Sequence, residues 1–266
     1  MSAPVRRCAY CDATGNLTRE HLLPHALSLR SDDRLFGNIV AQGQHKVTSA
    51  EPTITDVYEN CNNGHLSVLD TYACGLYDKH FVEIVRAGDC VKFEFDYELL
   101  LRWLLKTAYN FARARKGQWP IALLAQLREY ILGVNPKRPA ARVVLQLIKP
   151  AKVELGSVKE FPNITESPMF FNRVGLFDFS FAPGFLTGFL ITLNCYYFHM
   201  FLEDSATNTR SRERVFKRLI KDIPGGFQLV PGKKAVVYPS SLDQFQVAKT
   251  SHPLIRNMRD WYKWKK

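Results

Sequence analysis

Three cysteine residues in the first part of the sequence place the strongest constraint on the fold. Cys8 and Cys11 form a C-x-x-C pair, and Cys61 follows later in the chain. In a reducing compartment, such a pair followed by another cysteine is more typical of a metal clip than of a disulfide framework. The pattern therefore predicts an amino-terminal unit that is held together by a bound metal ion.

Length and charge limit the classes of protein to be considered. The chain has 266 residues, of which 46% are hydrophobic, so it can build one large domain or two small ones around a sizeable core. It carries 36 Lys and Arg against 25 Asp and Glu, a formal net charge of +11. This excess favours a polyanionic partner or an acidic membrane surface. No secretory leader is recognisable at the start, and we expect a cytoplasmic protein.

One stretch is long and apolar enough to suggest a membrane span. Residues 179–202 contain no Lys, Arg, Asp or Glu. However, Pro183, Gly184 and Gly188 would break a helix, whereas the many Phe, Thr, Ile and Tyr residues are typical of buried strands. We therefore expect core sheet at these residues and no membrane interaction.

The remaining sequence predicts a mixture of helices and antiparallel strands. Asp96 is a suitable N-cap for a helix over residues 99–116, and a second helix should begin at Trp119-Pro120 and end at Gly133. A basic amphipathic helix is expected over residues 209–222. Residues rich in β-branched and aromatic side chains predict strands at 91–97, 141–148, 169–181, 188–202 and 234–239.

Two short motifs lie between and beside the cysteines. Glu20-His21-x-x-Pro24 follows the C-x-x-C pair, and Cys61-Asn62-x-Gly64-His65 comes next. In this order the three motifs resemble the HNH endonucleases over residues 8–70. The resemblance implies an α+β protein with a small ββα-metal unit. We expect this HNH-like domain at residues 1–85 and a mixed helix and sheet domain at 86–266, which binds nucleic acid or a partner.

The resemblance also implies roles for four residues. Hydrolysis of a phosphodiester requires a base that activates water and a cation that neutralises the departing oxygen. His21 would be the base, while Glu20 and Asn62 would hold Mg²⁺ or Mn²⁺, ions that prefer oxygen ligands. His65 would touch the ion or the scissile phosphate. The resemblance also implies DNA as the preferred substrate and a role in restriction or antiphage defence.

Zinc-bearing members of the family hold zinc with four cysteines, and this chain matches three of them. Tyr58 stands at the fourth position. Either another group completes the zinc site or zinc has been lost and Tyr58 packs in its place. Groups that could complete the site are His65, His25 and Cys74.

A second departure affects the catalytic histidine. Thr53 stands at the position of the family's middle asparagine, which orients the catalytic imidazole, so a hydroxyl or a backbone carbonyl would have to substitute. Two other functions therefore remain open. One is a catalytically inactive, zinc-clipped module that binds nucleic acid, and the other is an assembly protein whose aromatic sheet docks a partner subunit or a second copy.

Basic residues at helical spacing indicate where nucleic acid would bind. On the first long helix, a stripe is formed by Arg102, Lys106, Asn110 and Arg113. On the later basic helix, a denser stripe is formed by Arg210, Arg214, Lys217, Arg218 and Lys221. The tail at residues 256–266 interleaves cations with aromatic rings. Such surfaces bind phosphates and stack on unpaired bases without reading sequence.

Overall fold

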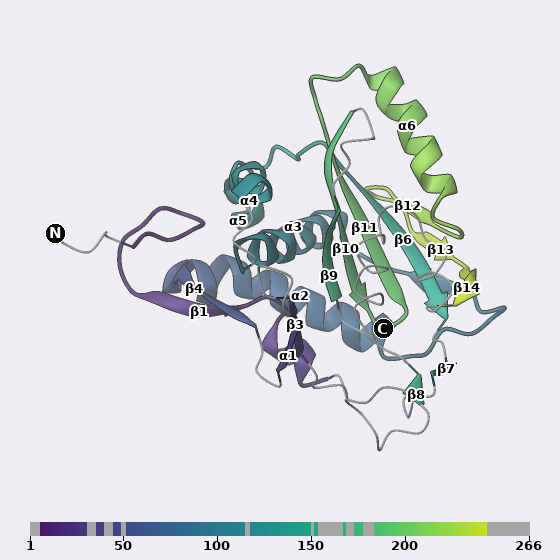
Figure 1. Cartoon of the computed structure of the whole chain (residues 1–266), viewed down its shortest axis with the longest axis horizontal. Helices are drawn as coiled ribbons and strands as arrows, with labels where there is room; N and C mark the ends of the chain where they lie inside the picture. The colour runs from purple at the N-terminus through teal and green to yellow at the C-terminus, as the bar shows by residue number, and fades with distance from the viewer. Residues whose placement is uncertain are drawn as a thin grey trace. The chain divides into compact units, whose positions relative to one another are not determined.

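The computed structural model describes residues 6–30, 36–39, 45–48, 52–114, 118–149, 152–153, 167–168, 173–177 and 184–243. The fold is of the α+β class, with helices and antiparallel sheets (Figure 1). Packing divides the chain into two compact units whose segments alternate along the sequence. Unit 1 comprises Met1–Lys79 and Phe95–Pro139, and unit 2 comprises His80–Glu94 and Ala140–Lys266. The long helix that we expected in a domain after residue 85 therefore belongs to unit 1.

Unit 1 contains two paired strands followed by a helical segment. Strand β1 (Leu17–His21) pairs antiparallel with β4 (Thr53–Tyr58). The chain then enters a π-helical turn, η1 (Cys61–Leu66), which continues into α2 (Ser67–Leu76). The other elements of this part of the chain are α1 (His25–Ser28), β2 (Phe36–Ile39), β3 (His45–Thr48) and η2 (Tyr77–Phe81).

Helix α3 (Tyr97–Ala114) is the core of unit 1, and it contacts α2 and β4. As predicted, Asp96 caps it, because its Oδ1 accepts a hydrogen bond of 3.0 Å from the amide of Leu99. Twelve of the eighteen residues of α3 are buried, so this helix lies inside the unit and not at its surface. Its polar residues must therefore find partners within the protein.

The helix expected to end at Gly133 is two helices. α4 (Gln118–Ala125) and α5 (Arg128–Leu132) are separated by a turn at Gln126 and Leu127. The predicted end is confirmed, because Gly133 has a φ of 75° and its amide bonds back to Tyr130.

Unit 2 is built on an antiparallel sheet with the strand order β12-β6-β11-β10-β9, and β14 pairs in parallel with β6. The strands of this sheet are β6 (Ala141–Lys149), β9 (Arg173–Phe177), β10 (Phe185–Leu193), β11 (Tyr196–Glu203), β12 (Phe227–Leu229) and β14 (Pro239–Asp243). Two small ribbons pair β5 (Val91–Phe93) with β13 (Ala235–Val237), and β7 (Lys152–Val153) with β8 (Ser167–Pro168).

The stretch expected to form one strand at 188–202 is a hairpin. β10 and β11 are joined at Asn194, whose φ of 50° is left-handed, and at Cys195. Asparagine tolerates this conformation better than most residues, but a single Asn in an apolar run is a weak turn signal. Among the described residues, no helix is long and apolar enough to cross a membrane.

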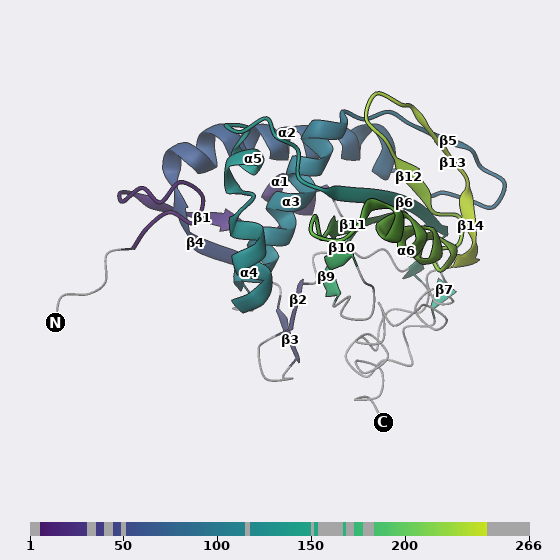
Figure 2. The same ribbon diagram turned by 90° about the horizontal axis from the view of Figure 1, so that it is seen from above.

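The hairpin can be apolar on both sides because both faces of the sheet are covered. Helix α6 (Thr209–Lys221) lies against one face of the sheet (Figure 2). Its Phe216 and Leu219 belong to the buried cluster that includes Val144 and Phe201 of the sheet. On the other face, the segment at residues 80–94 contributes an aromatic cluster of Phe81 and Phe93 with Tyr196 and Phe198. All four of these rings are buried within unit 2.

Candidate metal centre and histidine strand

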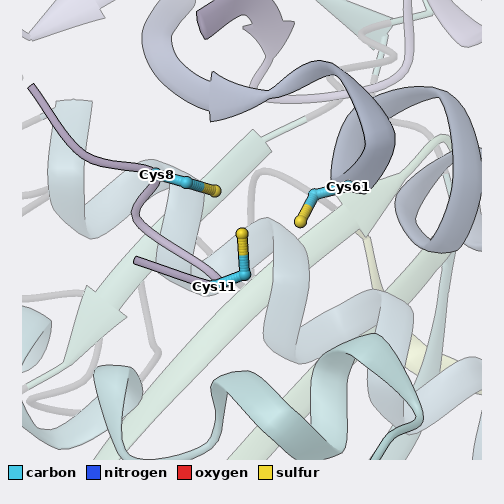
Figure 3. A group of neighbouring side chains, drawn as sticks. All are labelled: Cys8, Cys11 and Cys61. Carbon is cyan, nitrogen blue, oxygen red and sulfur yellow. The ribbon is translucent and has the colours of Figure 1, made fainter. Parts of the chain in front are cut away.

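The three expected cysteines meet in unit 1. Figure 3 shows the sulfurs of Cys8, Cys11 and Cys61 pointing toward one another, and all three lie within 4.8 Å of each other. Thiolates bound to one tetrahedral zinc ion lie about 3.8 Å apart, given a Zn–S bond of about 2.3 Å. Among the described residues, no other trio of Cys, His, Asp or Glu ligand atoms gathers in this way.

The loop around Cys8 is arranged to stabilise a thiolate. Backbone amides of Tyr10 and Tyr58 donate hydrogen bonds to Cys8 Sγ, at 3.3 and 3.2 Å. Burial acts to raise the pKa of this thiol, but the backbone hydrogen bonds outweigh it and the pKa lies below its ordinary value. The loop closes at Asp12, whose φ is 58°, and Tyr109 Oη holds it by donating to the carbonyl of Ala9 at 3.0 Å. The loop that would bind a metal ion is therefore already held in one conformation by these hydrogen bonds.

The fourth position of the centre is not filled by any of the three side chains that we considered. His25, His65 and Cys74 do not belong to the thiol group. Tyr58 contributes its amide to Cys8, and its ring packs over Gly15, where an added Cβ would lie 3.0 Å from the ring. The packing role is therefore the one that the geometry supports for Tyr58.

His21 is the last residue of β1 and lies directly opposite Thr53 on β4. Directly paired residues on antiparallel strands have Cβ atoms about 5 Å apart, so Thr53 is the cross-strand neighbour of His21. On its other flank, the ring of His25 stacks on His21 with a centroid distance of 5.3 Å. His25 is exposed and forms part of the surroundings of His21.

Glu20 was expected to hold the catalytic ion, but in the structure its carboxylate is paired with a lysine. The side chain is buried, and its Oε1 lies 2.6 Å from Lys106 Nζ and 3.1 Å from Asn110 Nδ2. The same ammonium group lies 2.5 Å from Asp70 Oδ1. The ammonium group of Lys106 therefore occupies the position between two carboxylates that a metal ion would need. Its positive charge would repel a metal ion there.

Asn62 joins the helical segment to β1. Its Nδ2 donates to Thr18 Oγ1 at 2.9 Å and to the carbonyl of Arg19 at 3.0 Å. This contact lies two residues before His21, or about 7 Å along an extended strand. Both hydrogen bonds use the nitrogen, so the amide oxygen is the atom that could face an ion. His65 lies further along η1 and is exposed.

The three cations of the basic stripe expected on α3 have partners within the protein. Lys106 is buried between its two carboxylates. Arg113 has a side chain that is 6% exposed, and its Nη1 lies 2.7 Å from Asp56 Oδ1. Arg102 donates to the carbonyl of Ile131 at 3.0 Å and is part-buried. Regular spacing of polar residues shows that they share one side of a helix, but it does not show that this side is exposed to solvent.

The basic stripe on α6 is exposed in unit 2. Asn208 caps the helix by accepting a hydrogen bond of 2.8 Å from the amide of Arg210. The carboxylate of Glu213 lies 2.6 Å from Arg142, and the hydrogen bond from this arginine lowers the pKa of Glu213. The exposed cations of the stripe are Arg210, Arg214, Lys217, Arg218 and Lys221. The tail at 256–266 lies outside the described residues.

Sequence reasoning missed Asp70, and it assigned Asn110 to the basic stripe of α3 without foreseeing its buried contacts. Asp70 completes the ion triad with Glu20 and Lys106, and buried Asn110 bonds to Glu20 and to the backbone of His21. The only available signal was that both are polar residues within helices that are otherwise mostly apolar. The same pattern is expected for the solvent-exposed face of a helix. Comparison of the chain with protein-family models, with curated proteins and with solved structures finds no match.

Proposed function

We propose that the protein is a metal-dependent nuclease of the HNH type that hydrolyses phosphodiester bonds in DNA. The observation that carries this proposal is the order and packing of three elements in unit 1. A strand that ends in His21 pairs with β4, and the helical segment that follows is joined to this strand through Asn62. The thiol group lies within the same unit.

The residues of this unit divide the proposed chemistry between them. His21 would take the proton of the attacking water, with Thr53 beside it on the paired strand. Mg²⁺ or Mn²⁺ would supply neutralisation of the charge on the departing oxygen. The amide oxygen of Asn62 and the imidazole of His65 are the groups on η1 that would hold this ion. Glu20 is excluded from the ligand set because Lys106 neutralises it.

Zinc is the metal that best suits the thiol group. Zinc prefers thiolate ligands, and Cys8 already accepts two amide hydrogen bonds of the kind that stabilise a bound thiolate. In this role, Cys8, Cys11 and Cys61 would tie the amino-terminal loop to the start of the helical segment. This metal cross-link would stabilise the unit, because its paired strands are too short to be stable alone.

The proposed substrate is a nucleic acid because of the positive charge of the chain and the exposed stripe on α6, and DNA is preferred because of the resemblance to the HNH endonucleases. Five phosphate contacts would give a slope of about −4.5 in a plot of log affinity against log salt concentration. A role in restriction or antiphage defence, within the cytoplasm, forms part of this proposal. RNA remains an alternative substrate with the same backbone chemistry.

Cleavage of plasmid DNA in Mg²⁺ or Mn²⁺ tests the proposal. We expect the wild type to cut and His21→Ala to lose activity by about 100-fold or more, the usual contribution of a general base. His25→Ala is the matched control, since it removes the neighbouring ring and leaves the proposed base. Equal cleavage by wild type and His21→Ala would indicate contamination and contradict the proposal.

A second candidate is a zinc-clipped module that binds nucleic acid without cutting it. The neutralisation of Glu20 by Lys106 favours this function, because it removes one expected ligand of the catalytic ion. In that case, DNA binding would depend on salt and would be the same for wild type and His21→Ala. Neither protein would cleave DNA in either metal.

A further inference from the structure

Asn110 is a fully buried amide in the centre of unit 1, and four groups of the unit surround it. Its Oδ1 accepts hydrogen bonds from Tyr10 Oη at 2.6 Å and from Arg113 Nη2 at 2.5 Å. Its Nδ2 donates to Glu20 Oε1 at 3.1 Å and to the carbonyl oxygen of His21 at 3.3 Å. The amide therefore uses both hydrogens and both lone pairs.

The identity of these partners fixes the orientation of the amide. Tyr10 and Arg113 approach with donors, while Glu20 and the carbonyl of His21 offer acceptors. Rotating the amide by 180° would set donor against donor and acceptor against acceptor. A buried, fully bonded group of this kind holds its neighbours in one arrangement, because each displaced partner would lose its hydrogen bond without gaining water.

Two of these neighbours belong to the parts of the unit that we associate with function. Tyr10 lies between Cys8 and Cys11 in the loop of the thiol group, and it is 2% exposed. Its ring packs edge-on against Tyr109, with a centroid distance of 5.3 Å. The carbonyl of His21 lies at the end of β1, next to the proposed catalytic imidazole. A single side chain therefore connects the thiol loop to the histidine strand.

We propose that Asn110 is a positioning residue that sets the backbone of His21, and that Tyr10 links this position to the thiol loop. This inference rests on the proposed nuclease function. Asn110 bonds to the backbone carbonyl of His21 and not to its ring. Its role therefore differs from that of a residue that bonds to the imidazole and selects its tautomer. Filling of the thiol centre by metal and placement of His21 are then coupled through two hydrogen bonds.

The test compares Asn110→Asp and Tyr10→Phe with the wild type. Asn110→Asp keeps the size and the oxygen that accepts from Tyr10 and Arg113, but it replaces the nitrogen that donates to Glu20 and His21 by a second acceptor oxygen. Tyr10→Phe removes only the hydroxyl. Tyr130→Phe is the matched control, since it removes another hydroxyl of unit 1, which donates to Glu98 at 2.6 Å.

Three readouts are measured on the full-length protein. They are kcat and KM on a DNA duplex, the ¹³C shift of the His21 carbonyl, and the affinity of the thiol centre for Co²⁺ from its thiolate charge-transfer absorption. We expect Asn110→Asp to lower kcat by about 10- to 100-fold with little change in KM, to move the carbonyl shift and to weaken Co²⁺ binding. Tyr10→Phe should change all three in the same direction by less.

Failure of this inference can be told apart from failure of the nuclease proposal. If Tyr10→Phe leaves both the carbonyl shift and the Co²⁺ affinity at the values of Tyr130→Phe, the coupling is wrong, whatever the activity. A folded Asn110→Asp protein with unchanged kcat would overturn the positioning role. If the wild type does not cut DNA at all, the nuclease proposal fails, whereas shifts in the two spectroscopic readouts would still support the link.

Discussion

Replacement of Lys106 by methionine tests the buried ion triad of unit 1. The ammonium contacts Glu20 at 2.6 Å and Asp70 at 2.5 Å, so those two carboxylate oxygens cannot lie more than about 5 Å apart. Without the lysine, two negative charges at about 5 Å and an effective dielectric constant of about 20 repel by roughly 3 kcal/mol. This agrees with the loss of about 3 to 5 kcal/mol that is usual when one partner of a buried pair is removed.

Urea denaturation near neutral pH measures this loss as a change in the free energy of unfolding. Burial already raises the pKa of Asp70 above its ordinary value, and we expect it to rise further in the Lys106→Met variant because the lysine that lowers it is gone. The variant is then most stable below the unfolded pKa, at about pH 4, and loses stability as pH rises through the raised value. The difference from wild type should therefore be smaller at about pH 5 than at about pH 7.5.

Two further variants make the result decisive. Lys137→Met removes an exposed lysine of unit 1 and should change stability by less than about 0.5 kcal/mol. Combining Lys106→Met with Glu20→Gln and Asp70→Asn should recover much of the stability, because no uncompensated charge remains. A loss below about 1 kcal/mol for Lys106→Met, or one that does not depend on pH, would refute the triad.

Three other predictions concern backbone geometry, titration and DNA binding. Gly133→Ala should lower stability by about 1 to 2 kcal/mol in thermal melts because φ at this position is 75°, whereas Gly75→Ala, in α2 with open space around it, should raise stability slightly. The hydrogen bond from Arg30 lowers the pKa of Asp78, so the stabilisation is present above the ordinary pKa and is lost as pH falls through the lowered one; an NMR titration of Arg30→Ala should show an ordinary pKa for Asp78. Lys217→Glu on α6 should weaken DNA binding and reduce the salt slope by about 0.9, while reversal of an exposed lysine outside α6 should not.

Much of the fold could be predicted because local patterns decide it. The cap at Asp96, the strand β6 and the basic helix α6 were each expected from spacing and composition, and the structure confirms them. The hairpin at Asn194 and the break between α4 and α5 were missed. At both turns, the apolar pattern of the sequence continues from one element into the next without a break. Tertiary packing therefore determines where the chain bends.

The candidate site was predicted in part. The proximity of Cys8, Cys11 and Cys61 was expected from the C-x-x-C pair followed by a third cysteine, a pattern typical of a metal clip, and the structure brings the three sulfurs together. The pairing of Glu20 with Lys106 was not expected from the sequence. Each residue was judged from its own segment, whereas its charge is neutralised by a residue distant in sequence. Ion pairs between distant segments leave no periodic signal along the chain.

Chemical rescue of His21→Gly tests the catalytic role of His21 most directly. The variant keeps the chain and lacks only the imidazole, so free imidazole can take its place if the missing group was the base. We predict slow cleavage of DNA by the variant in Mn²⁺ and a rate that rises with added imidazole until it saturates, with no such rise for the wild type. Cleavage by the variant at the wild-type rate, or no cleavage by the wild type, would contradict this account.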